Sequence, residues 1–269
     1  MSTKLKSNLF KLQRSKTNSG MLGYIEKLVR THPLIYFFIR YLVRFTNIFE
    51  EDAKGVKFLK LNENVNIIDV GASDGIASKF FCHNLKVKNI ICYEPNAFYV
   101  KILRKLNIGN LIVKPYAIGN KNTVKKIFFP RYKFFNKNLD LIPYTYYDKK
   151  TLLSQLNLDI KYRKNIKIIE KKLYLKKVKK LNLKIDLIKI DVNDNGLSVI
   201  NGLSKIIKRD KPALIVETDS DISKINKKLK SYGFDKYSFS NIDNKFIKIN
   251  KKFPLNTYFL QKSHLVKNK

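Results

Sequence analysis

Ile67-Ile68-Asp69-Val70-Gly71-Ala72-Ser73-Asp74-Gly75-Ile76 joins an apolar run to the start of an amphipathic segment through a turn with two glycines. The pattern predicts a strand, a tight turn and a helix. Gly71 and Gly75 permit close approach of a ligand to the backbone, which a Cβ would obstruct. A dinucleotide-binding turn would carry glycines at 71, 73 and 76, but Ser73 and Ile76 stand at the last two positions. We therefore expect a ligand without a pyrophosphate.

An acidic residue follows the next apolar run. Ile90-Ile91-Cys92-Tyr93-Glu94-Pro95-Asn96 predicts a second strand that ends at Glu94, 19 residues after Gly75. A carboxylate at this place can accept hydrogen bonds from both ribose hydroxyls of a nucleoside. A glycine turn followed by an acid at this spacing indicates a nucleoside-containing ligand more strongly than the turn alone.

The chain after Leu61 alternates short β-branched runs with amphipathic helical periods, which is typical of a doubly wound, mostly parallel α/β sheet. The expected strands are Val65–Val70, Asn89–Glu94, Leu111–Ile118, Ile185–Val192 and Ala213–Glu217. A helix that contains Ile222, Ile225 and Leu229 should end at Gly233. Asp235–Phe239 and Thr257–Gln261 then predict two terminal strands, which would complete a seven-stranded sheet with an antiparallel edge.

At these motifs the sequence resembles the FkbM family of methyltransferases. The matching residues are Asp69-Val70-Gly71-Ala72, Gly75, Ser78, Glu94-Pro95-Asn96, Lys189-Ile190-Asp191-Val192, Gly202, Pro212 and Val216-Glu217. The resemblance covers about residues 65–235 and implies a class I, Rossmann-like fold. It also implies that S-adenosylmethionine donates a methyl group to a hydroxyl, often on a sugar or glycan.

The resemblance assigns cofactor binding to residues of three segments. Gly71, Ala72 and Gly75 would border the methionine part, and Glu94 would hold the ribose. The complete expected set is Asp69, Gly71, Ala72, Ser73, Asp74, Gly75, Glu94, Pro95, Asn96 and Ala117.

Two carboxylates are candidates for the catalytic side. Asp191 and Glu217 end predicted strands, where either could accept the acceptor proton; either could instead bind a nearby Lys or backbone amides. The family has Glu-Gly after Asp191-Val192, whereas this chain has Asn193-Asp194. This departure fits a divergent acceptor, and it also fits a homologue that binds cofactor without catalysis.

Two regions lie outside the alternating pattern. Residues 1–60 combine a basic tail with a helical extension, whose segment 34–45 would either pack on the catalytic domain or make weak peripheral contact with a membrane. Residues 119–184 are rich in aromatics, so this insertion is either a lid or acceptor-binding element, or an accessory layer packed by those aromatics. Residues 61–269 would form the methyltransferase domain.

The formal net charge of +34 raises the alternative of a nucleic-acid partner, such as an RNA substrate. Only eight of the 55 basic residues are Arg, and the Lys residues are spread along the whole chain, so we do not expect a dedicated nucleic-acid site. His32, His83 and His264 lack ligand spacing, and no metal site is expected. Cys82 and Cys92 fall in predicted core elements, which is expected of free thiols in a cytoplasmic protein. Membrane contact by segment 34–45 would place that protein at the periphery of the inner membrane.

Overall fold

The computed structural model describes residues 38, 41–42, 49–134, 137–141, 145–153, 166–178, 181–193, 195–218, 220–250 and 252–266. The chain divides into two compact units, Thr46–Lys125 with Leu173–Lys269, and Met1–Phe45 with Lys126–Lys172. Most of the predicted N-terminal extension lies outside the described residues. Of segment 34–45, Phe38, Tyr41 and Leu42 are described; they are helical and exposed. None of the helices described is long and apolar enough to cross a membrane.

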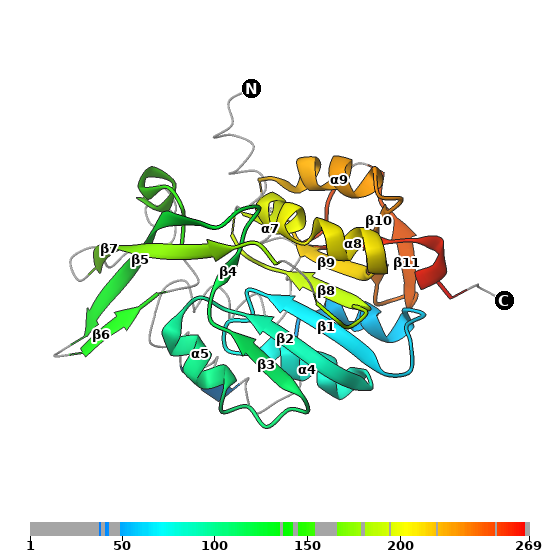
Figure 1. Ribbon diagram of the computed structural model, residues 1–269, viewed down its shortest axis with the longest axis horizontal. Helices are drawn as coiled ribbons and strands as arrows, with labels where there is room; N and C mark the ends of the chain where they lie inside the picture. Colours follow the sequence, from blue (N-terminus) through cyan, green and yellow to red (C-terminus); the bar gives the residue numbers. More distant parts are fainter. Residues whose placement is uncertain are drawn as a thin grey trace. The chain divides into compact units, whose positions relative to one another are not determined.

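The larger unit contains an eight-stranded mixed sheet in the order β11-β10-β12-β9-β8-β1-β2-β3 (Figure 1). Five neighbours, β3, β2, β1, β8 and β9, are parallel, and β12, β10 and β11 continue the sheet with antiparallel pairs. The strands are β1 Val65–Val70, β2 Val87–Tyr93, β3 Leu111–Lys114, β8 Leu187–Ile190, β9 Ala213–Glu217, β10 Asp235–Ser240, β11 Lys245–Lys248 and β12 Asn256–Leu260.

Both faces of this sheet are covered, because alternate strand residues point to opposite sides. Ile68 packs in a core with the helices α7, α8 and α9, which are Gly196–Gly202, Ser204–Asp210 and Ile222–Lys230. Its neighbour Ile67 packs in the opposite core, with the 3-10 helix η1 and the helices α4 and α5, which are Glu51–Phe58, Ile76–Asn84 and Ala97–Leu103. The fold is therefore doubly wound, as the alternating sequence pattern predicted.

The prediction of a seven-stranded sheet was wrong by one strand. Lys245–Lys248 forms β11, which pairs with β10 as an antiparallel hairpin. The hairpin closes through a turn in which Asn244 has a φ of 50°. The four residues of β11 are mostly exposed, so the strand lacks the apolar run by which buried strands are recognised in a sequence.

The predicted strand Leu111–Ile118 is divided in the structure. Pro115 has no N–H with which to continue the ladder beyond Lys114. Residues Ala117–Ile118 form β4, which pairs with Leu175 and Lys176 of β7 in a second sheet of order β4-β7-β5-β6. The other strands of that sheet are β5 Thr123–Phe134, β6 Lys137–Asp140 and β7 Ile166–Lys176.

The smaller unit has a hydrophobic cluster of its own. Leu141 and Leu152 are buried, and Phe128, Tyr132 and Tyr146 pack against them. Residues Phe128 and Tyr146 also exchange two backbone hydrogen bonds of 2.8 and 2.9 Å. Several aromatics of the insertion therefore pack within the smaller unit, and both alternatives for the insertion stay predictions.

Candidate functional site

The strand order reverses between β1 and β8, the point at which open α/β sheets bind ligands beyond the carboxyl ends of their strands. Gly71 follows β1, and Asp191 follows β8. A Cβ on Gly71 would lie 1.9 Å from the Asp191 carbonyl oxygen, so only glycine fits here. The first glycine of the turn thus allows the two strand ends to approach each other.

The turn after β1 is held in a conformation that side chains usually avoid. Gly71, Ser73 and Gly75 have φ angles of 78°, 51° and 80°. The Gly71 N–H donates to the Tyr93 carbonyl at 2.9 Å, and the Gly75 N–H donates to Ala72 at 2.9 Å. A Cβ on Gly75 would lie 2.2 Å from Leu106 Cδ1, so this glycine lets α4 begin against the core.

Glu94 connects this turn to the end of β2. Its two carboxylate oxygens accept backbone N–H bonds from Ser73 at 2.9 Å and from Asn96 at 2.8 Å. The residue is 6% exposed. Burial raises the pKa of Glu94 to about 7, and the two backbone N–H donors oppose that rise. The free protein therefore has a carboxyl group that titrates near neutral pH at the place predicted for a ribose ligand.

The remaining cofactor candidates have different surroundings. Asp74 and Ala72 are buried within the turn. Pro95 is exposed, while Asn96 caps α5 by accepting the Phe98 N–H at 2.8 Å. Ala117 is half-buried in β4, beyond the break that ends β3. The structure thus brings the turn and Glu94 together and assigns Asn96 a capping contact.

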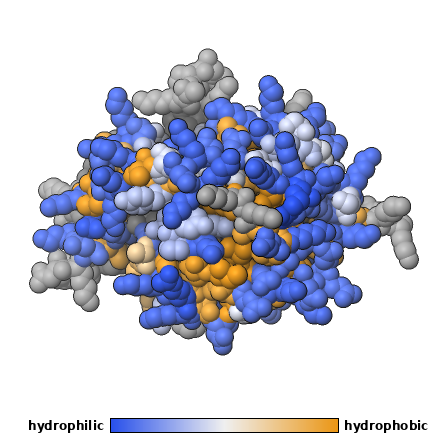
Figure 2. Space-filling model, viewed as in Figure 1, coloured by the Kyte–Doolittle hydropathy of each residue, from blue (hydrophilic) through white to orange (hydrophobic). Residues whose placement is uncertain are grey.

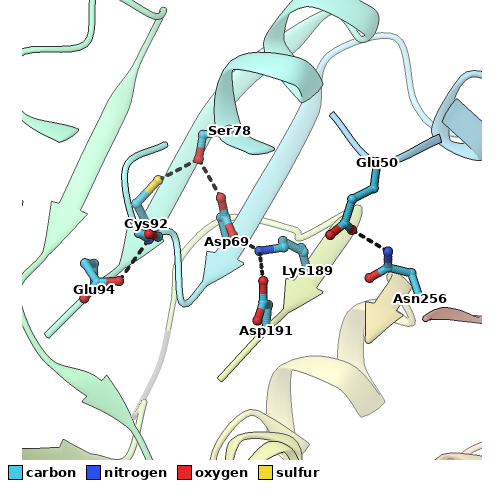
Figure 3. Close-up of polar contacts among 9 residues, drawn as sticks. Glu50, Asp69, Ser78, Cys92, Glu94, Lys189, Asp191 and Asn256 are labelled. Atoms are coloured by element: carbon cyan, nitrogen blue, oxygen red, sulfur yellow. Dashed lines mark hydrogen bonds and ion pairs between the residues drawn. The ribbon is translucent and has the colours of Figure 1, made fainter. Parts of the chain in front are cut away.

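A buried cation lies beneath the switch point. The ammonium of Lys189 lies 3.1 Å from Asp191 Oδ2 and 3.7 Å from Asp69 Oδ1 (Figure 3). Asp69 is fully buried, and its other oxygen accepts the Ser78 hydroxyl at 2.6 Å. Burial alone would lower the pKa of Lys189, but Asp191, Asp69 and Glu50 together raise it above its usual value. Lys189 therefore stays charged at neutral pH.

Glu50, Asp52 and Asn256 form a second polar group, in which the charge of Glu50 acts on Lys189. The Asn256 side chain, at the start of β12, donates to Glu50 Oε2 and to Asp52 Oδ1. Glu50 as a whole residue is exposed, yet its carboxylate is turned inward toward Lys189 and Asn256 (Figure 3). Removal of this carboxylate from water, together with the charges of Asp52 and Asp191, raises the pKa of Glu50, and Asn256 and Lys189 oppose that rise; the resulting pKa is about 7.

Glu217 ends β9 directly opposite Asn256 in the antiparallel register with β12. It is half-buried. Asp191 has a side chain that is 39% exposed. Both predicted carboxylates thus lie at the carboxyl edge of the sheet, on the side of the switch point away from Glu94. In the altered loop after β8, Asn193 has a φ of 40°, and Asp194 lies outside the described residues.

Lys189, Glu50, Asp52 and Asn256 were not among the predicted site residues. Lys189 could have been found, because a cation within the apolar run Leu187-Ile188-Lys189-Ile190 must find a partner when the strand is buried. Glu50 and Asn256 are separated by 206 residues and belong to no local pattern. Only the fold brings them together.

Residues 69–236 match the Methyltransferase FkbM domain. The match spans more than half of the chain. The chain belongs to the FkbM methyltransferase family. The motifs that carried the resemblance, from Asp69 to Glu217, fall within the matched range. A comparison with curated protein sequences found no match.

Solved structures similar to this FkbM family member are distant in sequence. FkbM from Methylobacillus flagellatus KT is 14% identical, with a TM-score of 0.45, over 78% of this chain and 48% of that protein. This chain therefore spans about half the length of that relative. Precorrin-6y C5,15-methyltransferase from Geobacter metallireducens GS-15 is 11% identical, with a TM-score of 0.39, over 80% and 88%. TrmK from M. capricolum, in complex with S-adenosylhomocysteine, is 12% identical, with a TM-score of 0.39, over 82% and 72%.

Proposed function

We propose that this protein is an S-adenosylmethionine-dependent methyltransferase that methylates a hydroxyl group of a sugar or glycan. The observation that carries the proposal is the position of Glu94, whose carboxylate meets the backbone of the turn after β1 at Ser73. Family membership supports methyl transfer, and the hydroxyl acceptor follows from the resemblance to that family. We place the protein in the cytoplasm, where the free thiols Cys82 and Cys92 would stay reduced.

The residues present fit a nucleoside ligand. Each carboxylate oxygen has two acceptor positions, so Glu94 retains acceptor capacity for ribose hydroxyls beside its two backbone donors. The turn from Gly71 to Gly75 lacks the third glycine that a pyrophosphate requires. We therefore assign the ribose to Glu94 and the amino-acid part of the ligand to Ala72, Ser73 and Asp74 of the turn, together with Asp69 near the end of β1.

When bound, S-adenosylmethionine supplies a methyl group that is already activated by a sulfonium. The protein has mainly to align the acceptor and to take one proton from it. Asp191 and Glu217 lie at the strand ends on the acceptor side. We assign Asp191 the orientation of the acceptor hydroxyl, because its partly exposed carboxylate is fixed by Lys189. The acceptor-binding role of insertion 119–184 is part of the same proposal.

Calorimetry with S-adenosylmethionine, S-adenosylhomocysteine and NAD tests the cofactor assignment. We expect the first two to bind and NAD to fail, because the turn lacks a dinucleotide fingerprint. Binding of NAD alone would overturn the proposal.

Hydrophilic side chains cover most of the face shown in Figure 2 and surround a hydrophobic area. Because the net charge of +34 leaves RNA as the alternative acceptor, the acceptor assay should include RNA beside glycan precursors; methylation of RNA alone would reject the glycan assignment.

A further inference from the structure

We propose that Glu50, which precedes η1, is the group that accepts the proton of the acceptor hydroxyl. This inference rests on the proposed function and extends it to a residue upstream of the family's matched range. The acceptor oxygen bonds to the methyl carbon, the carbon–sulfur bond breaks with its electron pair passing to sulfur, and the hydroxyl proton passes to the Glu50 carboxylate. The products are the methyl ether, a neutral thioether and a protonated carboxyl group, so atoms and charge balance.

The position of Glu50 is the first argument. Its partner Asn256 is paired with Glu217 at the carboxyl edge of the sheet, and its carboxylate is directed toward Lys189 at the switch point (Figure 3). Glu94 lies on the opposite side of Asp69 in the same view. A ligand that extends from Glu94 across the end of β1 therefore points its far end toward Glu50.

The other carboxylates of this cluster have fixed partners. Asp191 accepts a hydrogen bond from the Lys189 ammonium, and a proton on Asp191 would break that ion pair. Asp69 is fully buried and binds Ser78. Asp52 accepts both the backbone and the side-chain N–H of Asn256. Glu50 accepts the Asn256 amide at Oε2, a hydrogen bond that a protonated carboxyl group can keep, so Glu50 can take up a proton without losing this partner.

The charges around Glu50 suit it to this role. Asp52 on η1 and Asp191 after β8 are negative and favour the protonated form of Glu50, whereas Lys189 opposes them. The charge of Glu50 in turn helps to raise the pKa of Tyr258 on β12. Burial is the largest cause, and burial, Asp52 and Asp191 together outweigh Asn256 and Lys189 and raise the pKa of Glu50 to about 7, the range in which a general base works best at neutral pH. Asn256, which is 4% exposed, holds the carboxylate in place.

The test compares S-adenosylmethionine with S-adenosylhomocysteine by calorimetry at pH 7, in buffers of different ionisation enthalpy. Both ligands carry the ribose, so Glu94 contributes equally to both. Only the first brings a sulfonium charge, which would expel a proton from a nearby carboxyl group. We expect S-adenosylmethionine to release up to about half a proton more, because a group with a pKa near 7 is half protonated at that pH. Glu50→Gln should abolish the difference.

Asp52→Asn is the matched control. It removes a neighbouring charge but leaves Glu50 in place, so the extra proton release should persist and move to lower pH. If neither ligand binds, the proposed function itself fails. If both bind and Glu50→Gln keeps the full difference, the assignment of Glu50 fails while the proposed function stands.

A measurement on the wild-type protein covers the case in which Glu50→Gln does not fold. Side-chain carboxyl carbons of 13C-labelled glutamate would be titrated in both complexes, with Glu50→Asp identifying the signal. We expect the Glu50 signal to titrate at lower pH in the S-adenosylmethionine complex. An unchanged titration of that signal would overturn the proposal.

Discussion

The α-carbon of Gly71 faces the backbone of Asp191 so closely that no side chain fits between them: a Cβ on Gly71 would lie 1.9 Å from the Asp191 carbonyl oxygen. The neighbouring Asp191 N–H donates to the Val70 carbonyl at 3.0 Å, so β1 and β8 remain bonded up to the switch point. This contact fixes the spacing of the two strand ends between which the ligand would bind.

Gly71→Ala should therefore destabilise the protein strongly. The substitution places a methyl group against backbone and also imposes a φ of 78° on alanine, and we expect a loss of about 3 kcal/mol or more in the free energy of unfolding. Gly109→Ala is the control, because Gly109 has a φ of 38° but no atom within 4 Å of a Cβ; it should cost about 1 to 2 kcal/mol. Chemical denaturation measures both. Equal losses would show that the approach to Asp191 is not tight.

Lys189→Met should destabilise the core by about 3 to 5 kcal/mol, because it leaves Asp69 buried without its compensating charge. Adding Asp69→Asn to this variant should restore much of the loss. Lys224→Met removes an exposed ion pair with Asp221 and should change the stability far less than Lys189→Met does. A double-mutant cycle by urea denaturation gives the coupling; a coupling near zero would mean that Lys189 and Asp69 do not stabilise each other.

Glu94→Ala should weaken S-adenosylmethionine binding by about 10- to 150-fold, since hydrogen bonds to a charged group contribute about 1.5 to 3 kcal/mol. The variant also loses the hydrogen bonds from the backbone N–H groups of Ser73 and Asn96, so its melting temperature must be compared with that of the wild-type protein. Asn110→Ala removes an exposed side-chain hydrogen bond to the Lys88 carbonyl and serves as the control, with affinity expected to stay unchanged. Unchanged affinity in Glu94→Ala would exclude the ribose assignment.

The affinity for S-adenosylhomocysteine should fall as the pH decreases from 8 to 6. The pKa of Glu94 in the free protein is raised to about 7, so the ionised acceptor that we assign to the ribose is present above pH 7 and is lost below it. The ionised fraction falls roughly tenfold over this interval, and affinity should follow. Calorimetry at several pH values measures this dependence. Glu94→Gln should bind with little change over the same range; a wild-type curve equally flat would contradict the prediction.

Much of the parallel sheet could be predicted because local patterns encode it. Strands β1 and β9 have the bounds expected from their apolar runs, and the turn between β1 and α4 follows from its glycines. The exposed strand β11 and the break at Pro115 were missed, since the first has a weak pattern and the second depends on which sheet β4 joins.

Some residues of the candidate site could likewise be predicted from the sequence, and others could not. Glu94 and Asp191 follow apolar strands, so their positions at one edge of the sheet could be inferred from the sequence. Glu50 and Asn256 could not, because a polar residue outside a periodic segment carries no information about its distant partner. Lys189 is an intermediate case: its place in a buried strand indicated a partner, and the structure identifies Asp69 and Asp191.

The pairing of β4 with β7 bears on how such a protein can change over evolution. Gly119 and Lys176 are hydrogen-bonded neighbours, at 3.1 Å, although 56 residues separate them in the chain. The boundaries of the larger unit at Lys125 and Leu173 fall within β5 and β7, which are neighbouring strands of the second sheet. A segment inserted in this manner can be lengthened, shortened or exchanged while the two strands that carry its ends stay paired in the sheet. The same parallel strands could thus accept a succession of different inserts without refolding.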